Sequence, residues 1–291
     1  MKIHENVEIH EETGSKNNFF NLFLLFILFF YFSNENQVIP EIMGAVLSLG
    51  ANSSTHIALK SAGLKLLGHL SDWMGVQDGG KYLTGAMDFI MKTMQDSDLA
   101  SVASKTLSDV CKSRSCKPLL VPYADHLTTL IKQADEQHDL PHDSAVALYA
   151  GIASILTNLE NNEICEKIMV LLESIVKQLS EEKNKTFPPI KIYDKLAAVY
   201  RSLFQSLGQL KEGEVSPIYQ PLNQTWGYFK ENYQLFGKDL KCTERWCRLI
   251  RFGVRGLQRK VPDNDMLISS ICEFLPQAFQ AFQHSALLYA E

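Results

Sequence analysis

The sequence predicts an all-α fold in which helical hairpins stack into a solenoid. From Val38 onward, apolar residues recur at the spacing of a helix face, and short stretches of Gly, Pro, Asn and Asp separate the segments. Alternating patterns typical of strands are nearly absent. In residues 55–74, for example, Ile57, Leu64 and Trp73 fall on one broad apolar stripe, and Lys60 and Lys65 lie off it.

The punctuation between these segments sets the expected helix boundaries. Proline is tolerated at the start of a helix because the N–H that it lacks would have no partner there, and Pro118, Pro141, Pro189 and Pro217 fall at such positions. We expect helices over residues 38–49, 54–74, 80–95, 98–113, 117–136, 142–158, 162–181, 190–210, 218–236, 240–260 and 263–288.

Consecutive helices pair into units that open near residues 54, 98, 142, 190 and 240. Helical hairpins that recur every 40–47 residues or so are typical of HEAT and armadillo repeats. We therefore expect an α-α superhelix, an ARM/HEAT-type solenoid of about five to six repeats over residues 37–291. The last segment runs to Glu291 without a polar capping helix, so we expect a piece of a longer solenoid.

Composition excludes several classes of protein. Hydrophobic residues make up 46% of the chain and charged residues 21%, which argues against global disorder. The net charge of -5 argues against nucleic-acid binding by the chain as a whole, so any basic site has to be local. The six cysteines form no Cys-x-x-Cys pair of the kind that binds zinc. We interpret them as reduced, partly buried thiols of an intracellular protein.

Residues 1–36 differ from the rest of the chain. They contain the apolar run FFNLFLLFILFFYF over residues 19–32, which is shorter than the 20 or so residues of a spanning helix. The run is a membrane anchor, a buried helix or strand of the first repeat, or non-native sequence from a gene-model artefact such as a translated intron. The abrupt change of composition at Asn36 and the lack of helical periodicity favour the third interpretation.

The sequence offers no catalytic or metal-binding set. Residues 75–82, GVQDGGKY, nearly match a phosphate-binding loop, but Tyr82 replaces the Ser or Thr that binds magnesium, and a helix precedes the glycines instead of a strand. His138 and His142 straddle Pro141 and lack a third ligand. We therefore expect no enzyme activity, no cofactor and no metal.

Residues 239–260, DLKCTERWCRLIRFGVRGLQRK, carry a net charge of +5 within a chain of net charge -5. On a helix, five arginines fall within an arc of about 120° and extend over about 21 Å. These candidate binding residues are Arg245, Arg248, Arg251, Arg255 and Arg259. The opposite face carries an apolar stripe of Trp246, Ile250, Val254 and Leu257.

Such an arginine stripe has two interpretations. Guanidinium groups bind phosphate in a bidentate manner, so the stripe fits an extended phosphorylated peptide. Alternatively, it is a solvated helix face that Asp and Glu of neighbouring repeats neutralise. Five like charges on one face repel one another, and only Glu244 offers local relief.

Four blocks resemble a known family. IPEIMGAVLSL (39–49), HIALKSAGLKLLGHLSDW (56–73), LASVASKTLSDVCKS (99–113) and ERWCRLIRFGVRGL (244–257) resemble, in this order, the middle-to-C-terminal part of the importin-β (karyopherin-β) family of nuclear transport receptors. Within that family the resemblance is to the transportin-SR branch, of which importin-13 is a near relative. It covers residues 38–291, and residues 1–36 match nothing in the family.

This resemblance implies a function. Transportin-SR receptors import splicing factors rich in Arg-Ser dipeptides, usually phosphorylated, and shuttle between cytoplasm and nucleus. An arginine-rich helix of the receptor engages the phosphoserines, and residues 244–256 align with it. Cargo contacts are therefore implied for Arg245, Arg248, Arg251 and Arg255, and the helical stripe extends them to Arg259. The family binds Ran-GTP and the nuclear pore largely through N-terminal repeats, which this sequence lacks.

Three alternatives stay open at this point. The chain is a generic helical-repeat scaffold for another protein, an importin-13-like receptor with different cargo, or a membrane-anchored adaptor that uses residues 19–32. We expect no direct nucleic-acid partner, and a membrane partner only if residues 19–32 are a real anchor.

Overall fold

The computed structural model describes residues 35–52, 54–136, 140–182, 187–263 and 265–289. The chain divides into two compact units, Met1–Ser53 and Ser54–Glu291, and each is described by itself. The described part of the first unit is the helix α2 (Glu35–Ala51), whose Ile39, Met43 and Val46 are buried along one face. The apolar run 19–32 lies outside the described residues. Within the described ranges, no helix is long and apolar enough to cross a membrane.

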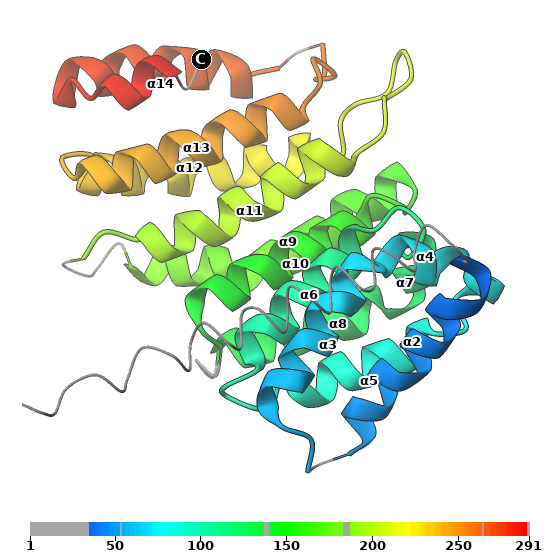
Figure 1. The fold of residues 1–291 in the computed structure, drawn as a ribbon. Helices are drawn as coiled ribbons and strands as arrows, with labels where there is room; N and C mark the ends of the chain where they lie inside the picture. Colours follow the sequence, from blue (N-terminus) through cyan, green and yellow to red (C-terminus); the bar gives the residue numbers. More distant parts are fainter. Residues whose placement is uncertain (1–34, 53, 137–139, 183–186, 264, 290–291) are drawn as a thin grey trace, which may run out of the picture. The chain divides into compact units, whose positions relative to one another are not determined.

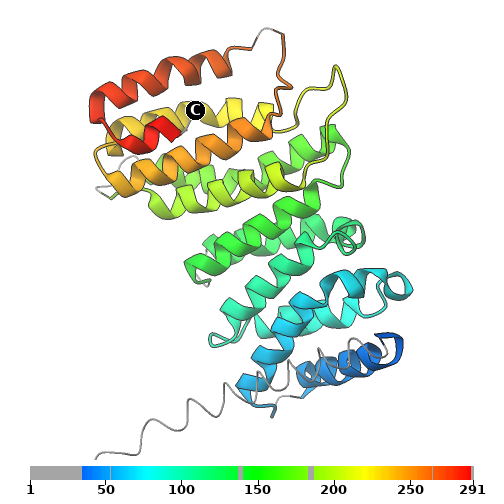
Figure 2. The ribbon, with the colours of Figure 1, turned by 45° about the horizontal axis from the view of Figure 1, so that its top comes forward.

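The second unit is built from helical hairpins that form two layers (Figures 1 and 2). The first layer contains α3 (Ile57–His69), α6 (Ala100–Lys112), α9 (His142–Leu156), α11 (Ile190–Ser206) and α13 (Leu240–Gly256). Each of these helices packs against the next in this order. The second layer contains α5 (Leu83–Thr93), α8 (Ala124–Glu136), α10 (Asn161–Glu182), α12 (Tyr219–Phe236) and α14 (Leu267–Phe282).

The first-layer helices of successive hairpins begin at Ile57, Ala100, His142, Ile190 and Leu240. The expected pairing and spacing of the repeats are therefore confirmed, and the fold is an all-α repeat solenoid. Close approach between neighbouring helices depends on small residues. At Gly151 of α9, a Cβ atom would lie 2.9 Å from Cα of Ser108 in α6, so the α6 backbone packs directly against this glycine.

Several predicted helices are shorter or interrupted. The range 54–74 divides at Leu70 into α3 and α4 (Ser71–Val76). The range 117–136 begins with α7 (Lys117–Leu120) and the 3-10 helix η2 (Val121–Tyr123), because Pro122 cannot donate a helical hydrogen bond. The range 263–288 resolves into α14 and the 3-10 helix η3 (Ser285–Tyr289), which packs against α13.

The near match to a phosphate-binding loop is a turn between helices, as expected. The 3-10 helix η1 (Gln77–Gly79) follows α4, so a helix precedes the glycines. Gly79 and Gly80 adopt positive φ angles of 64° and 89°, which L side chains rarely adopt. At Gly80, a Cβ atom would also lie 2.7 Å from the Leu119 side chain. The glycines therefore serve the turn and its packing.

A buried ion pair and its hydrogen-bond partners link three neighbouring repeats. Nζ of Lys195 in α11 donates to Oδ1 of Asp135 in α8 at 2.6 Å and to Oδ2 at 2.7 Å. The two side chains are only 9% and 8% exposed. Tyr149 of α9 and Gln178 of α10 also donate to this carboxylate. Removing one member of such a pair leaves an uncompensated buried charge, which is strongly destabilising.

We predict that Asp135→Asn lowers the free energy of unfolding by about 3–5 kcal/mol, because Lys195 loses its counter-charge. Asp125→Asn is the matched control. Asp125 lies in the same helix α8 and pairs with Lys167 at 2.7 Å, but the two side chains are 72% and 37% exposed. Its loss should cost less than about 1 kcal/mol. Urea unfolding measures the free energy of unfolding of both variants. Equal losses for Asp135→Asn and Asp125→Asn would contradict the assignment of a buried ion pair.

All six cysteines are free. Cys111, Cys116, Cys242 and Cys247 are buried, Cys165 is half-buried and Cys272 is exposed. Burial raises the pKa of Cys111, Cys242 and Cys247 to about 12 in each case. Because the thiolate is the reactive form, these side chains are inert at neutral pH.

We predict that a thiol reagent at pH 8 modifies Cys272 first and leaves the four buried cysteines unmodified in the native chain. Mass spectrometry after timed labelling identifies the modified residues. In denaturing urea all six should react at similar rates, because burial no longer raises the pKa values. Rapid native labelling of Cys111 would show that α6 is not packed as described.

Candidate functional site

The arginine-rich segment forms α13, and its N-terminus is capped by Asp239, which accepts from the Cys242 N–H at 2.7 Å. The predicted apolar stripe faces the core: Trp246 and Ile250 are fully buried, Leu257 is 1% exposed and Val254 is half-buried. Burial of this stripe leaves the opposite face of α13 at the surface. The orientation expected for the arginines is therefore determined by the core.

Trp246 anchors α13 in an aromatic cluster. Its ring centroid lies 4.6 Å from that of Tyr233 in α12 and 5.9 Å from that of Phe274 in α14. Trp226 lies 6.1 Å from Trp246 on another side. The Trp246 Nε1–H donates to the Phe229 carbonyl oxygen at 2.9 Å. The cluster thus fixes both the position and the rotation of α13 relative to α12 and α14.

The first two candidate arginines have different surroundings. Nε of Arg245 lies 3.3 Å from Oδ1 of Asp194 in α11, and both side chains are partly buried. Arg248, one turn further on, is exposed and forms no ion pair with the described residues. Within the described part of the chain, a carboxylate of a neighbouring repeat thus forms an ion pair with Arg245 and with no other candidate arginine.

The remaining three arginines do not continue a uniform stripe. Arg251 is half-buried, its Nε is buried without a hydrogen-bond partner, and its Cζ lies 5.4 Å from the centroid of the Phe252 ring. Arg255 is exposed in the last turn of α13. Arg259 is exposed but has a positive φ of 60°.

The predicted helix 240–260 is therefore corrected: α13 ends at Gly256. Gln258 and Arg259 both adopt left-handed backbone conformations, which terminate a helix. Arg259 consequently lies off the helical face that the sequence assigned to it. The continuous helical part of the stripe runs from Arg245 to Arg255.

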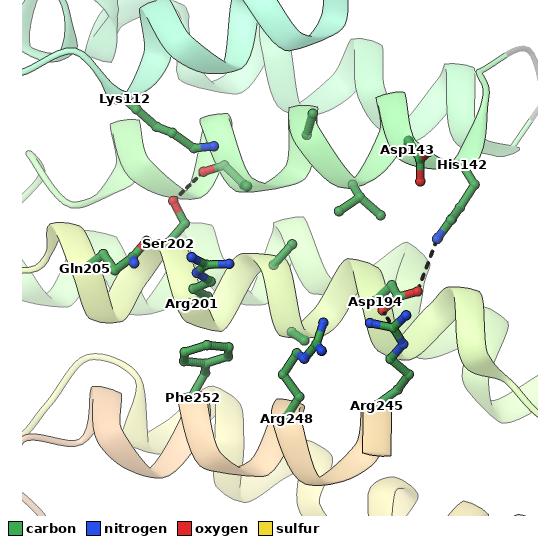
Figure 3. A pocket seen from close by; sticks show the side chains of 15 residues that line it. Lys112, His142, Asp143, Asp194, Arg201, Ser202, Gln205, Arg245, Arg248 and Phe252 are labelled. Carbon is green, nitrogen blue, oxygen red and sulfur yellow. Dashed lines mark hydrogen bonds and ion pairs between the residues drawn. The ribbon is translucent and has the colours of Figure 1, made fainter. Parts of the chain in front are cut away.

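Two of the candidate arginines line a groove of about 550 Å³ on the first layer, between α6, α9, α11 and α13 (Figure 3). Its polar lining comes from Lys112 of α6, His142 and Asp143 of α9, Asp194, Arg201, Ser202 and Gln205 of α11, and Arg245 and Arg248 of α13. Phe252 and several alanines complete it. The groove therefore draws its charged groups from four successive hairpins.

Charges separate along this groove (Figure 3). At one end, Oδ2 of Asp194 lies 3.4 Å from Nε2 of His142, and Oδ1 of Asp194 forms an ion pair with Arg245. Asp143 lines the same end. At the other end lie Lys112 and Arg201. The groove thus has an acidic end with two carboxylates, of which Asp194 is paired with Arg245, and a basic end.

The basic end is partly desolvated. Lys112 keeps exposed surface, but its amine lies at the groove wall, where burial lowers the pKa of Lys112. The charge of Asp109 opposes this shift, and the nearby Arg201 adds to it. Arg201 is exposed, and its Cζ lies 5.7 Å from the centroid of the Phe252 ring. An aromatic face next to a guanidinium holds it in place without neutralising its charge.

Sequence analysis missed Lys112, Arg201 and Asp194, because each is isolated in its own helix. The repeat spacing carried a weak signal, since Arg201 and Arg248 lie about one repeat apart, in the first-layer helices α11 and α13. No group of three or more His, Cys, Asp and Glu side chains able to hold a metal occurs among the residues that the structure describes.

We predict that Trp246→Ala lowers the free energy of unfolding by about 3–5 kcal/mol, because it empties a fully buried site and leaves the Phe229 carbonyl without its donor. Trp73→Ala is the control, since Trp73 is only half-buried and stacks on the single ring of Tyr82 at 5.4 Å. Urea unfolding compares the two. A larger loss for Trp73→Ala would contradict the anchoring role of Trp246.

Comparison with known proteins identifies the family. Residues 36–132 match the family described as the Transportin-3/Importin-13 third TPR domain, and residues 216–291 match its fourth TPR domain. Together the two matches cover more than half of the chain. The chain is also 20% identical to importin-13 of Gallus gallus over 275 residues, which is 88% of this chain and 27% of the relative. It therefore spans about a quarter of that relative's length. The chain belongs to the transportin-3/importin-13 family of nuclear transport receptors, within the importin-β family.

Proposed function

We propose that this chain carries the cargo-binding part of a nuclear import receptor and binds Arg-Ser-rich, phosphorylated segments of proteins such as splicing factors through α13. The observation that carries the proposal is the pair Arg248 and Arg255. Both are exposed, both project from a helix whose rotation is fixed by Trp246, and neither has an ion-pair partner among the described residues.

Phosphoserine suits these side chains better than carboxylate does. A phosphate carries a charge of roughly -1.5 to -2 at pH 7, and its three oxygens accept bidentate hydrogen bonds from guanidinium groups. The chain outside residues 239–260 is acidic. It therefore repels polyanions in general, and a short phosphorylated segment that reaches α13 is favoured over a long nucleic acid.

The remaining arginines have distinct expected roles. Arg245 is engaged by Asp194 and would have to exchange this partner for a phosphate. The buried Nε of Arg251 has no hydrogen-bond partner among the residues that the structure describes, so the rest of its guanidinium is the part that could reach cargo. Arg259 lies beyond the helix end and would contribute charge without a fixed position.

A receptor of this kind moves between cytoplasm and nucleus, and Ran-GTP releases its cargo in the nucleus. In the family, Ran engages N-terminal repeats, and the two matches here are to the third and fourth domains. We infer that this region contributes cargo binding and that Ran dependence requires repeats outside it. The similarity to importin-13 supports a second candidate, a receptor whose cargo is not Arg-Ser-rich.

We predict that the chain binds a phosphorylated Arg-Ser repeat peptide more tightly than its unphosphorylated form, and that added salt weakens the binding. Arg248→Glu combined with Arg255→Glu should abolish this preference. Each charge-assisted hydrogen bond contributes about 1.5–3 kcal/mol, so affinity should fall by roughly a hundredfold or more. Fluorescence anisotropy at two salt concentrations measures it.

The matched control is Lys177→Glu combined with Lys230→Glu. It makes the same change in net charge on α10 and α12, in the second layer. The control should bind the phosphopeptide almost as tightly as the native chain does. Equal binding of both peptides, unchanged by substitutions in α13, would exclude phosphorylated Arg-Ser cargo and favour the importin-13-like alternative.

A further inference from the structure

Cations from three hairpins line the groove. Lys112 of α6 and Arg201 of α11 lie at its basic end, and Arg248 of α13 lies between Arg201 and Arg245 (Figure 3). No ion pair joins any of the three to a carboxylate of the described residues. Like charges placed together at a groove wall repel one another, and a bound dianion would relieve this repulsion.

We propose that Arg201 and Lys112 form a phosphate-binding subsite and that Arg248 extends it toward α13, so that bound cargo crosses the first-layer helices from α13 toward α6. The inference rests on the proposed function and assigns its anchor point. It adds two residues, Arg201 and Lys112, that lie outside the arginine-rich segment. It also changes the expected path of the cargo, which the sequence pattern places along the axis of α13.

Geometry along α13 disfavours the axial path. Arg245 is held by Asp194, Arg251 is half-buried with its Nε enclosed, and the helix ends at Gly256 before Arg259. The axial stripe therefore offers isolated exposed guanidinium groups instead of a continuous ladder. The groove, in contrast, offers three cations around one volume of about 550 Å³, which exceeds what a phosphate group requires.

Two features make the subsite specific for an anion. The Phe252 ring lies under Arg201 and restricts its guanidinium without adding negative charge. The lowered pKa of Lys112 comes chiefly from burial of its amine, and a phosphate beside it would reverse this penalty. Asp143 and Asp194 make the other end of the groove unfavourable for phosphate, so the anion is directed to the basic end.

The test compares single substitutions, in the full chain, that each remove one positive charge. The probes are an Arg-Ser peptide with one phosphoserine and the same peptide without phosphate. Arg201→Gln and Lys112→Gln should each weaken binding of the phosphopeptide by about tenfold, since each removes a charge-assisted hydrogen bond. Binding of the unphosphorylated peptide should change less than twofold. Arg201→Lys should fall between the native chain and Arg201→Gln, because it keeps the charge but loses the bidentate fork.

Lys177→Gln, on the second layer, is the matched control and should leave both affinities unchanged. Arg201 is exposed and Lys112 keeps exposed surface although its amine is partly buried, so their substitution should alter urea unfolding little, which separates lost binding from lost folding. If Arg248→Glu combined with Arg255→Glu weakens binding of the phosphopeptide but Arg201→Gln and Lys112→Gln do not, the subsite is overturned and the proposed function stays in place. If the native chain binds both peptides equally tightly, the subsite and the proposed function are both overturned.

Discussion

Packing between neighbouring hairpins is the constraint on which the rest of the second unit depends. A single hairpin of this kind cannot bury the apolar faces of both its helices, whereas a stack of hairpins can. The contacts of α6 with α9, of α9 with α11 and of α11 with α13 form one continuous layer. Gly151 allows the first of these contacts, because any larger residue would collide with the α6 backbone. Each helix therefore presents one face to its neighbours and the other to solvent.

Polar groups give this packing its register. Lys195 reaches from α11 to Asp135 in α8, and Tyr149 and Gln178 complete the network from α9 and α10. Apolar surfaces tolerate small displacements, but a buried ion pair with fixed hydrogen-bond partners does not. The same α11 that is fixed in this way carries Asp194 and Arg201 into the groove. The structural network and the candidate site thus share one helix.

Local charge, rather than net charge, determines what this surface can bind. The chain is acidic overall, yet the first layer concentrates unpaired cations next to a few carboxylates. This arrangement opposes long polyanions, and the proposed phosphate site depends on its local excess of positive charge. Aromatic rings position the charged groups of this surface. Trp246 fixes α13 from within the core. The Phe252 ring lies against the guanidinium groups of both Arg201 and Arg251.

The sequence by itself determined the helices, their pairing into hairpins and the face of α13 that carries the arginines. These features depend on local periodicity and on proline and glycine, so they are visible along the chain. The tertiary structure alone decided which arginines are available. Asp194 neutralises Arg245 from another repeat, and the left-handed backbone at Gln258 and Arg259 ends the helix early.

Only stacking brings Lys112 and Arg201 into one groove with Arg248, because these residues belong to helices one or more repeats apart. A pattern within one helix contains no information about the rotation of its neighbours. That rotation results from the fit of buried side chains such as Trp246 and Lys195, which forms only when all the hairpins pack together.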